Sequence, residues 1–498
     1  MKHARDAYDA PLPRYVEDEL RGYLRCGDFA RGFVHLQCSA CKHDLLVAFS
    51  CKVRGLCPSC AGRRMAGQAA HLVDCVLPAV PIRQYVLSFP FELSALAATR
   101  PDVLRALARI HADVLGARYR LLAKRAGIAG RVHPGSVTFV QRFGSSLNLH
   151  VHLHTCALDG VFVEREGGVE FVAAAPPSRA ELYALVGRVF VRATKWLQRH
   201  GHLRDEPDVS NEPHARSFEE ALVLAATGRG TMDVLRDDGE PSEAEAETHD
   251  TPGGGSTDAV THHRFNLHAG VTVAADDDVG RERLCRYGLR PPFSLSRFRW
   301  LRDGRIAYRV KNSKRGAAKH RVMTPIECLT RLSALIPPPK YPLTRFHGVL
   351  APRAKLRRLV VPKPPETALP ACAKATAPPI AEPPPFEPRA AEPLVSKRPA
   401  RSAAALALVV AGAEASASNV LSAKHLQRIA GGLLYAATPN VPWATLLRRT
   451  FEVDTTACAR CAGPVRVRAV ITDPKTAQRI LDALAKPNAR GPPAPLAA

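Results

Sequence analysis

The sequence predicts an α+β protein with a metal-binding module near its N-terminal end. Three observations lead to this class: cysteine pairs crowded between Cys26 and Cys75, β-rich runs joined by turn residues, and separate stretches with helical spacing. At about 100–200 residues per domain, the 498 residues are enough for two to four domains. Because 46% of the residues are hydrophobic, a sizeable core is possible and a wholly disordered chain is excluded.

The net charge points to a polyanionic partner. The chain has 70 Lys+Arg against 46 Asp+Glu, a formal charge of +24. Such a surplus favours nucleic acid as the partner, although the chain is rich in Ala, Arg and Pro throughout, and biased composition is the alternative. No apolar stretch approaches the ~20 residues that span a bilayer, and the first residues lack the apolar core of a secretory signal. We therefore expect no membrane and a reducing compartment.

The cysteine module occupies residues 15–80, and residues 81–235 begin a mixed domain. A strand is expected at 83–88, and apolar residues at helical spacing predict a helix that starts near Thr99. A Gly-Ser-Ser turn joins two further β-rich runs into a hairpin. The remaining elements follow in order: hairpin strands 137–142 and 149–158, a second hairpin at 161–163 and 169–173, and a helix at 180–199.

An acidic, glycine-rich run at 236–262 interrupts this domain, and its lack of bulky apolar residues predicts a disordered insertion. The domain resumes at 263–350. A proline- and alanine-rich linker at 352–415 and a small C-terminal module at 420–487 follow. The elements expected after the insertion are a strand at 270–274, a helix at 279–289 ended by two prolines, a hairpin of 298–301 with 306–310, and a helix at 324–335.

Two cysteine pairs in the N-terminal module have the spacing of a zinc site. Cys38-x2-Cys41 and Cys57-x2-Cys60 are separated by 15 residues, so the four thiolates can surround one Zn²⁺. Reduced structural cysteines are the alternative, and other nearby residues are spare ligands: Cys26, His43, Cys51 and Cys75. Basic residues around the pairs predict a DNA-binding surface: Lys52, Arg54, Arg63 and Arg64.

The C-terminal module carries a third pair, Cys458-x2-Cys461. Two ligands do not close a structural site. This pair is therefore either two free thiols or half of a second zinc site that residues elsewhere complete.

Three histidines alternate in the strand expected at 149–158. His150, His152 and His154 lie at i, i+2 and i+4, so a strand places all three on one face. Adjacent imidazoles with an additional polar ligand can bind a divalent cation that activates a phosphodiester. The alternative is a histidine-rich polar strand that faces solvent.

A candidate nucleophile is Tyr287 on the helix expected at 279–289. Four arginines flank it in sequence: Arg281, Arg283, Arg286 and Arg290. Guanidinium groups attract a phosphate and favour an ionised hydroxyl. An ordinary half-buried helix tyrosine is the alternative, and spacing alone favours it.

Together these segments resemble the rolling-circle insertion-sequence transposases of the HUH endonuclease class, which carry an N-terminal transposase zinc-binding domain. Four motifs carry the resemblance, in the order that the family has them, over about residues 20–360, with a faint recurrence at 441–485. They are CGDFARGFVHLQCSACKHDLLVAFSCKVRGLCPSCAGRRM, QRFGSSLNLHVHLHTCALDGVFVE, LCRYGLRPPFSL and RFHGVLAPRAKLRRLVVP.

The resemblance implies an antiparallel, ferredoxin-like palm whose central strand carries the metal-binding histidine pair. The matching pair is His152 and His154, with His150 as an accessory residue, and the ion is Mg²⁺ or Mn²⁺. The matching nucleophile is Tyr287. Many members have a second tyrosine four residues earlier, where this chain has Arg283, so it resembles the single-tyrosine branch. A third ligand is expected, and Gln141 is the candidate.

These residues predict a bacterial, cytoplasmic, nucleoid-associated DNA transposase. It would nick single-stranded DNA at element ends through a 5′-phosphotyrosine and rejoin the strands, with Arg63, Arg64, Arg283 and Arg286 on DNA. A plasmid replication initiator or relaxase shares the chemistry, but the cysteine module argues against it. A zinc-dependent DNA-binding protein or decayed element without catalysis is the other alternative.

Overall fold

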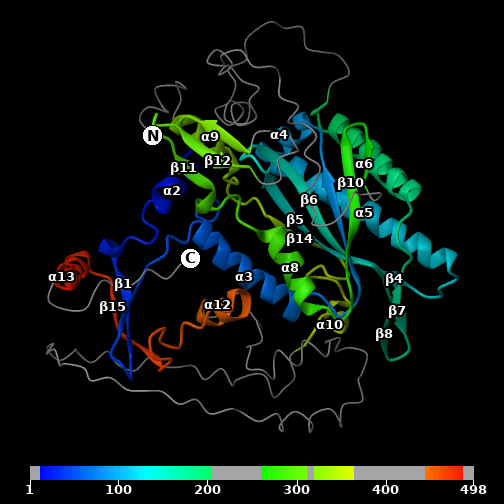
Figure 1. Ribbon diagram of the computed structural model, residues 1–498. Coiled ribbons are helices and arrows are strands. Elements are labelled where there is room, and N and C mark those ends of the chain that lie inside the picture. Colours follow the sequence, from blue (N-terminus) through cyan, green and yellow to red (C-terminus); the bar gives the residue numbers. More distant parts are fainter. Residues whose placement is uncertain (1–11, 204–258, 311–318, 364–442, 486–498) are drawn as a thin grey trace, which may run out of the picture.

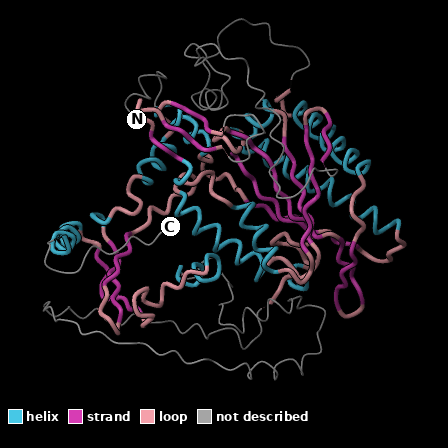
Figure 2. The backbone as a smooth tube through the Cα atoms, viewed as in Figure 1, coloured by secondary structure: helices cyan, strands magenta, loops and turns pink. Residues whose placement is uncertain are grey.

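The centre of the molecule is a six-stranded antiparallel sheet with helices on both faces (Figure 1 and Figure 2). The structure is a computed structural model that describes residues 12–203, 259–310, 319–363 and 443–485. The strand order is β14 (Thr344–Gly348), β5 (Gly135–Phe143), β6 (Leu149–Leu158), β3 (Ile82–Ser88), β10 (Phe265–Val273) and β9 (Ala259–His262).

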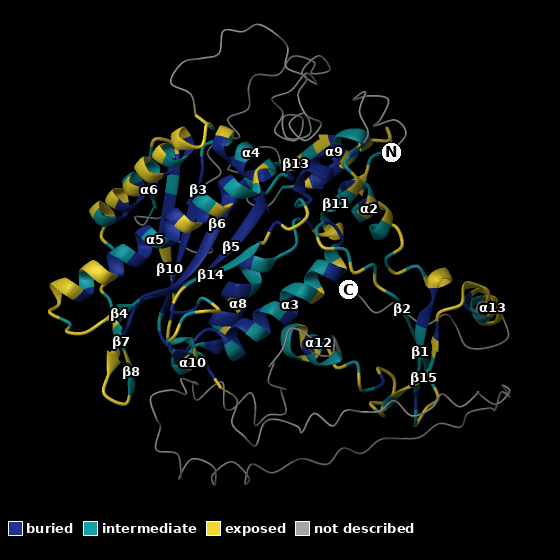
Figure 3. Ribbon diagram, turned by 180° about the vertical axis from the view of Figure 1, so that it is seen from behind, coloured by how far each residue is buried: buried dark blue, intermediate teal, exposed yellow. Residues whose placement is uncertain are grey.

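Alternation along β6 sorts its side chains between the two faces of this sheet. Leu153 pairs in register with Val140 and Leu87, and all three enter one apolar core. Helices α4 (Phe91–Thr99), α5 (Pro101–Arg125) and α6 (Arg179–Arg199) supply most of the helical residues of that core. In Figure 3 the central strands β5 and β6 are largely dark blue, and the outer turns of α6 are exposed. The main hydrophobic core therefore lies between this face of the sheet and the three helices.

Two helices, α3 (Pro58–Cys75) and α8 (Asp278–Leu289), cover the opposite face of the sheet (Figure 3). Leu72 of α3 and Cys285 of α8 join Phe139 and Cys156 of the sheet in a second core. Pro58 at the first helical position, where no N–H is needed, helps to start α3. A short C-terminal helix, α12 (Trp443–Phe451), packs on α3 through Leu446.

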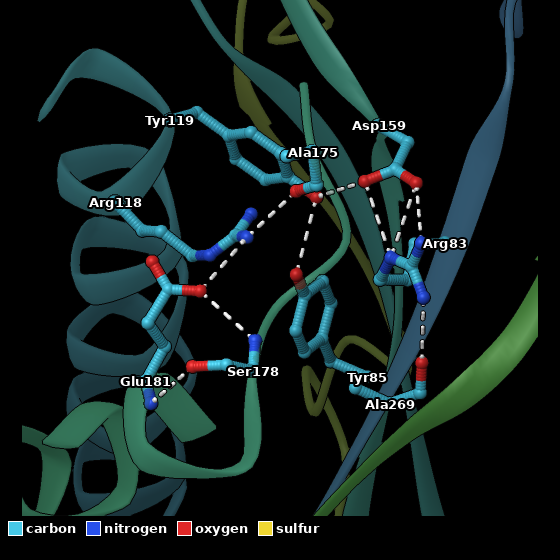
Figure 4. A network of polar contacts seen from close by, with 9 residues as sticks. All are labelled: Arg83, Tyr85, Arg118, Tyr119, Asp159, Ala175, Ser178, Glu181 and Ala269. Atoms are coloured by element: carbon cyan, nitrogen blue, oxygen red, sulfur yellow. Dashed lines mark hydrogen bonds and ion pairs between the residues drawn. The ribbon is translucent and has the colours of Figure 1, made fainter. Parts of the chain in front are cut away.

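A buried polar network fixes the sheet to the helices of the first face (Figure 4). Arg83 of β3 donates to both oxygens of Asp159, at 2.8 Å for the shortest bond. The same carboxylate accepts a hydrogen bond of 3.1 Å from the Tyr119 hydroxyl of α5, which lies 3.2 Å from that of Tyr85. Because the charged groups are paired, this network holds β3, α5 and the turn after β6 in one arrangement.

Two strands of the N-terminal module and one strand of the C-terminal module form a separate three-stranded sheet. The strands β1 (Phe33–Cys38) and β2 (Asp44–Ala48) form a hairpin, and β15 (Val465–Ile471) pairs antiparallel with β1. The flanking helices are α2 (Arg14–Tyr23), the 3₁₀ turn η1 (Phe29–Arg31) and α13 (Pro474–Ala485). The C-terminal module thus completes the sheet of the N-terminal one.

Two smaller sheets and short helices complete the described fold. One sheet joins β4 (Val132–His133), β7 (Gly160–Arg165) and β8 (Gly168–Ala173). The other joins β11 (Phe298–Trp300), β12 (Ile306–Arg309) and β13 (His320–Met323). The short helices are η3 (Leu295–Arg297), α9 (Pro325–Leu335) and α10 (Arg357–Val360). None of the helices in the described ranges is long and apolar enough to cross a membrane.

The expected mixture of helices with antiparallel sheets is observed, with different boundaries. The strand expected at 270–274 begins at Phe265, and α4 precedes the helix expected near Thr99. The last residues of the run expected to be disordered, Ala259–His262, pair with β10 as strand β9, because Val260 and Thr261 suit an extended edge. Most of the insertion and of the linker at 352–415 lies outside the described residues.

Candidate active site and metal centres

The three alternating histidines lie on the sheet face covered by α3 and α8. The ring centroids of His150 and His152 are 5.0 Å apart, and those of His152 and His154 are 4.9 Å apart. His152 is 3% exposed and His154 is 1% exposed. A solvent-facing polar strand is therefore not what the chain forms, because two of these rings are enclosed by protein.

Hydrogen bonds orient two of the rings. Nδ1 of His152 lies 3.0 Å from the backbone oxygen of His150, so Nδ1 carries the proton and donates it. Nδ1 of His154 lies 3.0 Å from Nε2 of Gln84, a buried residue of β3. With the amide turned over, its oxygen accepts from an Nδ1–H of His154, and the lone pair of that ring is then on Nε2. Such partners on the second ring nitrogen are typical of metal-binding histidines.

Helix α8 places Tyr287 against the histidine strand. The Asp277 side chain accepts a hydrogen bond from the Gly280 N–H at the start of the helix, and two prolines follow its end. The ring of Tyr287 packs edge-on against His154, with 5.4 Å between centroids. Cζ of Arg290 lies 4.4 Å from the centre of the tyrosine ring. Tyr287 itself is half-buried. Because its ring contacts His154, the candidate nucleophile and both candidate ligands lie on one face of the sheet.

Gln141 also lies in this group, but its amide is used to hold α8. It pairs in register with His152. Its Nε2 donates to the backbone oxygen of Tyr287 at 2.6 Å and to that of Gly288 at 3.3 Å. These carbonyls belong to the last turn of α8, which lacks helical partners. The geometry makes Gln141 a support for the tyrosine helix, and its expected role as third metal ligand stays a prediction.

The four arginines expected on DNA divide into two pairs. Arg63 and Arg283 are exposed. Arg64 instead donates to the backbone oxygens of Val53 and Arg54, each at 3.0 Å. Arg286 donates to the backbone oxygen of Thr450 at 3.0 Å. The structure therefore uses Arg64 and Arg286 to hold protein segments together.

A cleft of about 290 Å³ opens beside the end of α8. The loop before α3, the strands β5 and β14 and the residues that follow Tyr287 line it. Its charged lining is entirely basic: Arg54, Arg64, Arg142 and Arg290. This cleft therefore adjoins the N-terminal module and the group formed by His152, His154 and Tyr287, which we call the histidine–tyrosine group.

The cysteines gather in two groups of four, which differs from the single site that the sequence predicts. Cys57 and Cys60, at the start of α3, lie with Cys26 and Cys51. Cys38 and Cys41 lie with Cys458 and Cys461 of the C-terminal module. The two N-terminal pairs are thus in different groups, because β1 and β2 carry the first pair away from the start of α3. His43 and Cys75 are in neither group.

The first group has the dimensions of a four-thiolate zinc site. The Sγ atoms of Cys51 and Cys60 are 3.4 Å apart, and those of Cys26 and Cys60 are 3.9 Å apart. A tetrahedron with Zn–S bonds of about 2.3 Å has sulfur–sulfur edges of about 3.8 Å, so these residues fit the ion. The hydrogen bond with the Cys57 thiol lowers the pKa of Cys60 to about 4, which favours the thiolate that binds metal.

Sequence reasoning missed two features of the histidine–tyrosine group. Gln84 is the neighbour of His154, but its position opposite the histidines requires the β3–β6 register. Gly288 follows the tyrosine, and a Cβ there would lie 2.7 Å from Cγ of Phe139. A glycine directly after the candidate nucleophile was the available signal for this close approach.

Two family models match the chain. The model described as "Transposase zinc-binding domain" matches residues 1–89, and the model described as "Putative transposase" matches residues 135–358. The first contains all of the Cys26, Cys51, Cys57 and Cys60 group, and the second contains β6 and α8. No curated protein and no solved structure matches the chain. The chain therefore carries an IS91-family transposase zinc-binding domain, followed by a transposase domain that contains the histidine strand and Tyr287.

Proposed function

We propose that this protein is a rolling-circle transposase of the single-tyrosine HUH type, in which Tyr287 cleaves single-stranded DNA. One observation carries the proposal: α8, which is distant from β6 in the sequence, brings Tyr287 to the sheet face that carries His152 and His154. The ring centroids of His152 and His154 are 4.9 Å apart, and those of His154 and Tyr287 are 5.4 Å apart. Catalytic groups must reach one phosphate, and this group is compact enough to do so. The transposase domains make DNA the substrate class.

His152 and His154 are the proposed ligands of Mg²⁺ or Mn²⁺. Nδ1 of His152 donates to the His150 carbonyl, which leaves Nε2 of His152 for a metal. The Gln84 amide lies at Nδ1 of His154 and fixes that ring, and with its oxygen turned to Nδ1–H it also leaves Nε2 of His154 for the metal. A bound divalent cation would polarise the scissile phosphate and offset the charge that develops on it. Gln84 and Gln141 then act as positioning residues for His154 and for the tyrosine helix.

Tyr287 is the proposed nucleophile. Its phenolic oxygen forms a bond to phosphorus, the bond from phosphorus to the 3′ oxygen breaks, and the phenolic proton leaves the tyrosine while the 3′ oxygen gains one. The products are a 5′-phosphotyrosine and a free 3′-hydroxyl. Because the phosphotyrosine bond retains the energy of the phosphodiester, attack by a 3′-hydroxyl can rejoin a strand without ATP.

The basic cleft next to Tyr287 is the proposed path of the DNA strand. Arg54 and Arg290 line it, and Arg283 lies exposed one turn before the tyrosine. Its basic lining suits the phosphates of a DNA strand.

The test is covalent capture of labelled single-stranded element-end DNA with Mn²⁺. The wild-type chain should form a protein–DNA adduct, while Tyr287→Phe should bind the DNA and form none, since only the attacking oxygen is lost. His152→Ala should also abolish the adduct and leave structural zinc in place. Tyr308→Phe is the matched control, because Tyr308 is a buried tyrosine of β12 outside this group. DNA binding by the wild type without any adduct would favour the non-catalytic alternative.

A further inference from the structure

We propose that Cys38, Cys41, Cys458 and Cys461 form a second structural zinc site, which joins the N-terminal and C-terminal modules. The matched zinc-binding domain ends at residue 89 and contains only the first two of these cysteines. The pairs are more than 400 residues apart in sequence, with separations of 417 and 423 residues between facing thiols. The site is therefore incomplete without the C-terminal module.

The sulfur geometry is that of a tetrahedral four-thiolate site. Sγ of Cys38 lies 3.5 Å from that of Cys461, and Sγ of Cys41 lies 3.6 Å from that of Cys458. All four sulfurs lie within 4.8 Å of one another. These distances are close to the edge of about 3.8 Å that a ZnS₄ tetrahedron requires.

The two halves of the site have the same backbone pattern. Cys38 N–H donates to the oxygen of His43, and Cys458 N–H donates to the oxygen of Gly463, at 2.9 Å and 2.8 Å. The N–H after each second cysteine, on Lys42 and Ala462, donates to the oxygen of the first. Both of these residues are left-handed, with φ of 57° and 56°. Two equivalent turns thus present their thiols to one point.

The neighbouring backbone holds these turns face to face. Strand β15 pairs with β1 so that Val465 lies opposite Cys38, and Ser39 N–H donates to the oxygen of Pro464 at 2.9 Å. Gly463 lies directly against the sulfurs, since a Cβ there would be 3.2 Å from Sγ of both Cys38 and Cys461. The pairing and the missing side chain bring the four thiols together.

The sheet of β1, β2 and β15 has a small hydrophobic core, so a bound metal can contribute much of its stability. The buried apolar residues of its sheet and last helix are Phe33, Ile471 and Ala477. Val467 and Val470 of β15 are 62% and 60% exposed. A sheet with so little buried apolar surface depends on additional cross-links, and a four-thiolate ion supplies one.

The proposed ion also anchors the segment that contacts the tyrosine helix. Helix α12 ends at Phe451, shortly before Cys458, and Thr450 accepts a hydrogen bond from Arg286 of α8. Loss of the C-terminal pair should therefore loosen both the β1–β15 sheet and the α12–α8 contact.

Metal analysis of the purified full-length chain tests the site. The wild type should contain two zinc ions per chain, and the double variant Cys458→Ser/Cys461→Ser should contain one. Cys75→Ser is the control, because Cys75 lies in neither group, and it should keep two. One zinc ion in the wild type, or two in the double variant, would overturn the proposal.

Alkylation of the wild-type chain gives a second test that does not depend on a variant that folds. Cys41 and Cys461 are exposed, so as free thiols they would react readily. With zinc bound, mass spectrometry should find both protected, and a chelator should make both reactive together with Cys38 and Cys458. Rapid modification of Cys41 and Cys461 before chelation would contradict the site. Neither test depends on DNA cleavage, so the outcome for this zinc site is independent of the proposed function.

Discussion

Arg449 of α12 forms a buried two-pronged ion pair with Asp74 of α3. One of its hydrogen bonds to Asp74 is 2.8 Å long, and the same guanidinium donates to Glu282 of α8 at 3.0 Å. All three side chains are at most 4% exposed. Burial alone would lower the pKa of Arg449, but its hydrogen bonds and charge interactions with Asp74 and Glu282 raise it above the ordinary value. A single side chain thus fastens the C-terminal module to both helices over the histidine strand.

Replacing Arg449 should destabilise the protein strongly. Arg449→Met leaves the carboxylates of Asp74 and Glu282 buried without their cation, which typically costs about 3–5 kcal/mol. Denaturant unfolding followed by circular dichroism measures this loss. Arg448→Met changes the adjacent, exposed arginine of the same helix and should alter stability by less than about 1 kcal/mol. Equal effects of the two variants would show that the buried ion pair does not fasten α12.

A side chain at Gly288 should displace the tyrosine helix. In Gly288→Ala the added Cβ would lie 2.7 Å from Cγ of the buried Phe139, so the end of α8 or the ring must move. Overpacking of this kind costs about 1–3 kcal/mol. Adduct formation should fall with it, because Tyr287 is the preceding residue.

The control for this change is Gly187→Ala in α6. An added Cβ there would lie 3.7 Å from Nε2 of His262, an ordinary contact. Alanine should stabilise that helix by up to about 1 kcal/mol. If thermal melting showed both variants to be equally stable, the close packing of α8 on Phe139 would be refuted.

Gln84 should govern metal affinity at the histidine strand. Gln84→Leu removes the partner of His154 Nδ1 without much change in volume, and loss of such a partner typically weakens metal binding about 10–100-fold. The Mn²⁺ concentration for half-maximal adduct formation should rise accordingly. Gln84→Glu keeps an acceptor for Nδ1–H and should stay within a few-fold of wild type. An unchanged metal requirement in Gln84→Leu would remove Gln84 from the site.

Two buried histidines should make the fold sensitive to acid. Burial lowers the pKa of His111 to about 3, with a contribution from the charge of His347. Burial and the charge of Arg345 lower the pKa of His347 to about 4, against an opposing effect of Asp113. Both values lie below the unfolded value of about 6.5, so the unfolded chain binds more protons below that pH. The stability they contribute is complete above pH 6.5 and is lost as the pH falls towards 4.

His111→Leu should weaken this dependence. Each proton taken up only on unfolding gives a slope of about 1.4 kcal/mol per pH unit. Neither ring nitrogen of His111 has a hydrogen-bond partner among the described residues, so leucine should be tolerated. Unfolding between pH 4 and 7 should show a shallower slope in His111→Leu than in the exposed control His200→Leu. Parallel curves for the two variants would contradict the assignment.

The sequence contains enough information for the local parts of the candidate site. Alternation places His150, His152 and His154 on one face whatever the strand pairs with, and the arginine-rich run before Pro291 has the length and ending of a helix. Both elements are observed at those residues. Local spacing decides such features because they depend only on neighbours within a few residues.

Pairing between distant segments could not be predicted in this way. The spacing within Cys38-x2-Cys41 identifies a metal-binding turn but not its partner, and that partner comes from Cys458 and Cys461 through the β1–β15 register. The sequence analysis did not predict helix α3, although Pro58 marks its start. Gln84 likewise gains its role only from the β3–β6 register.

Mapping the DNA-linked peptide shows whether Tyr287 is the residue that attacks DNA. Wild-type protein is incubated with labelled single-stranded element-end DNA and Mn²⁺, the adduct is digested with protease and nuclease, and mass spectrometry locates the nucleotide. We expect the modification on Tyr287, within the peptide from α8. A nucleotide on any other tyrosine, with Tyr287 unmodified, would show that Tyr287 is not the nucleophile.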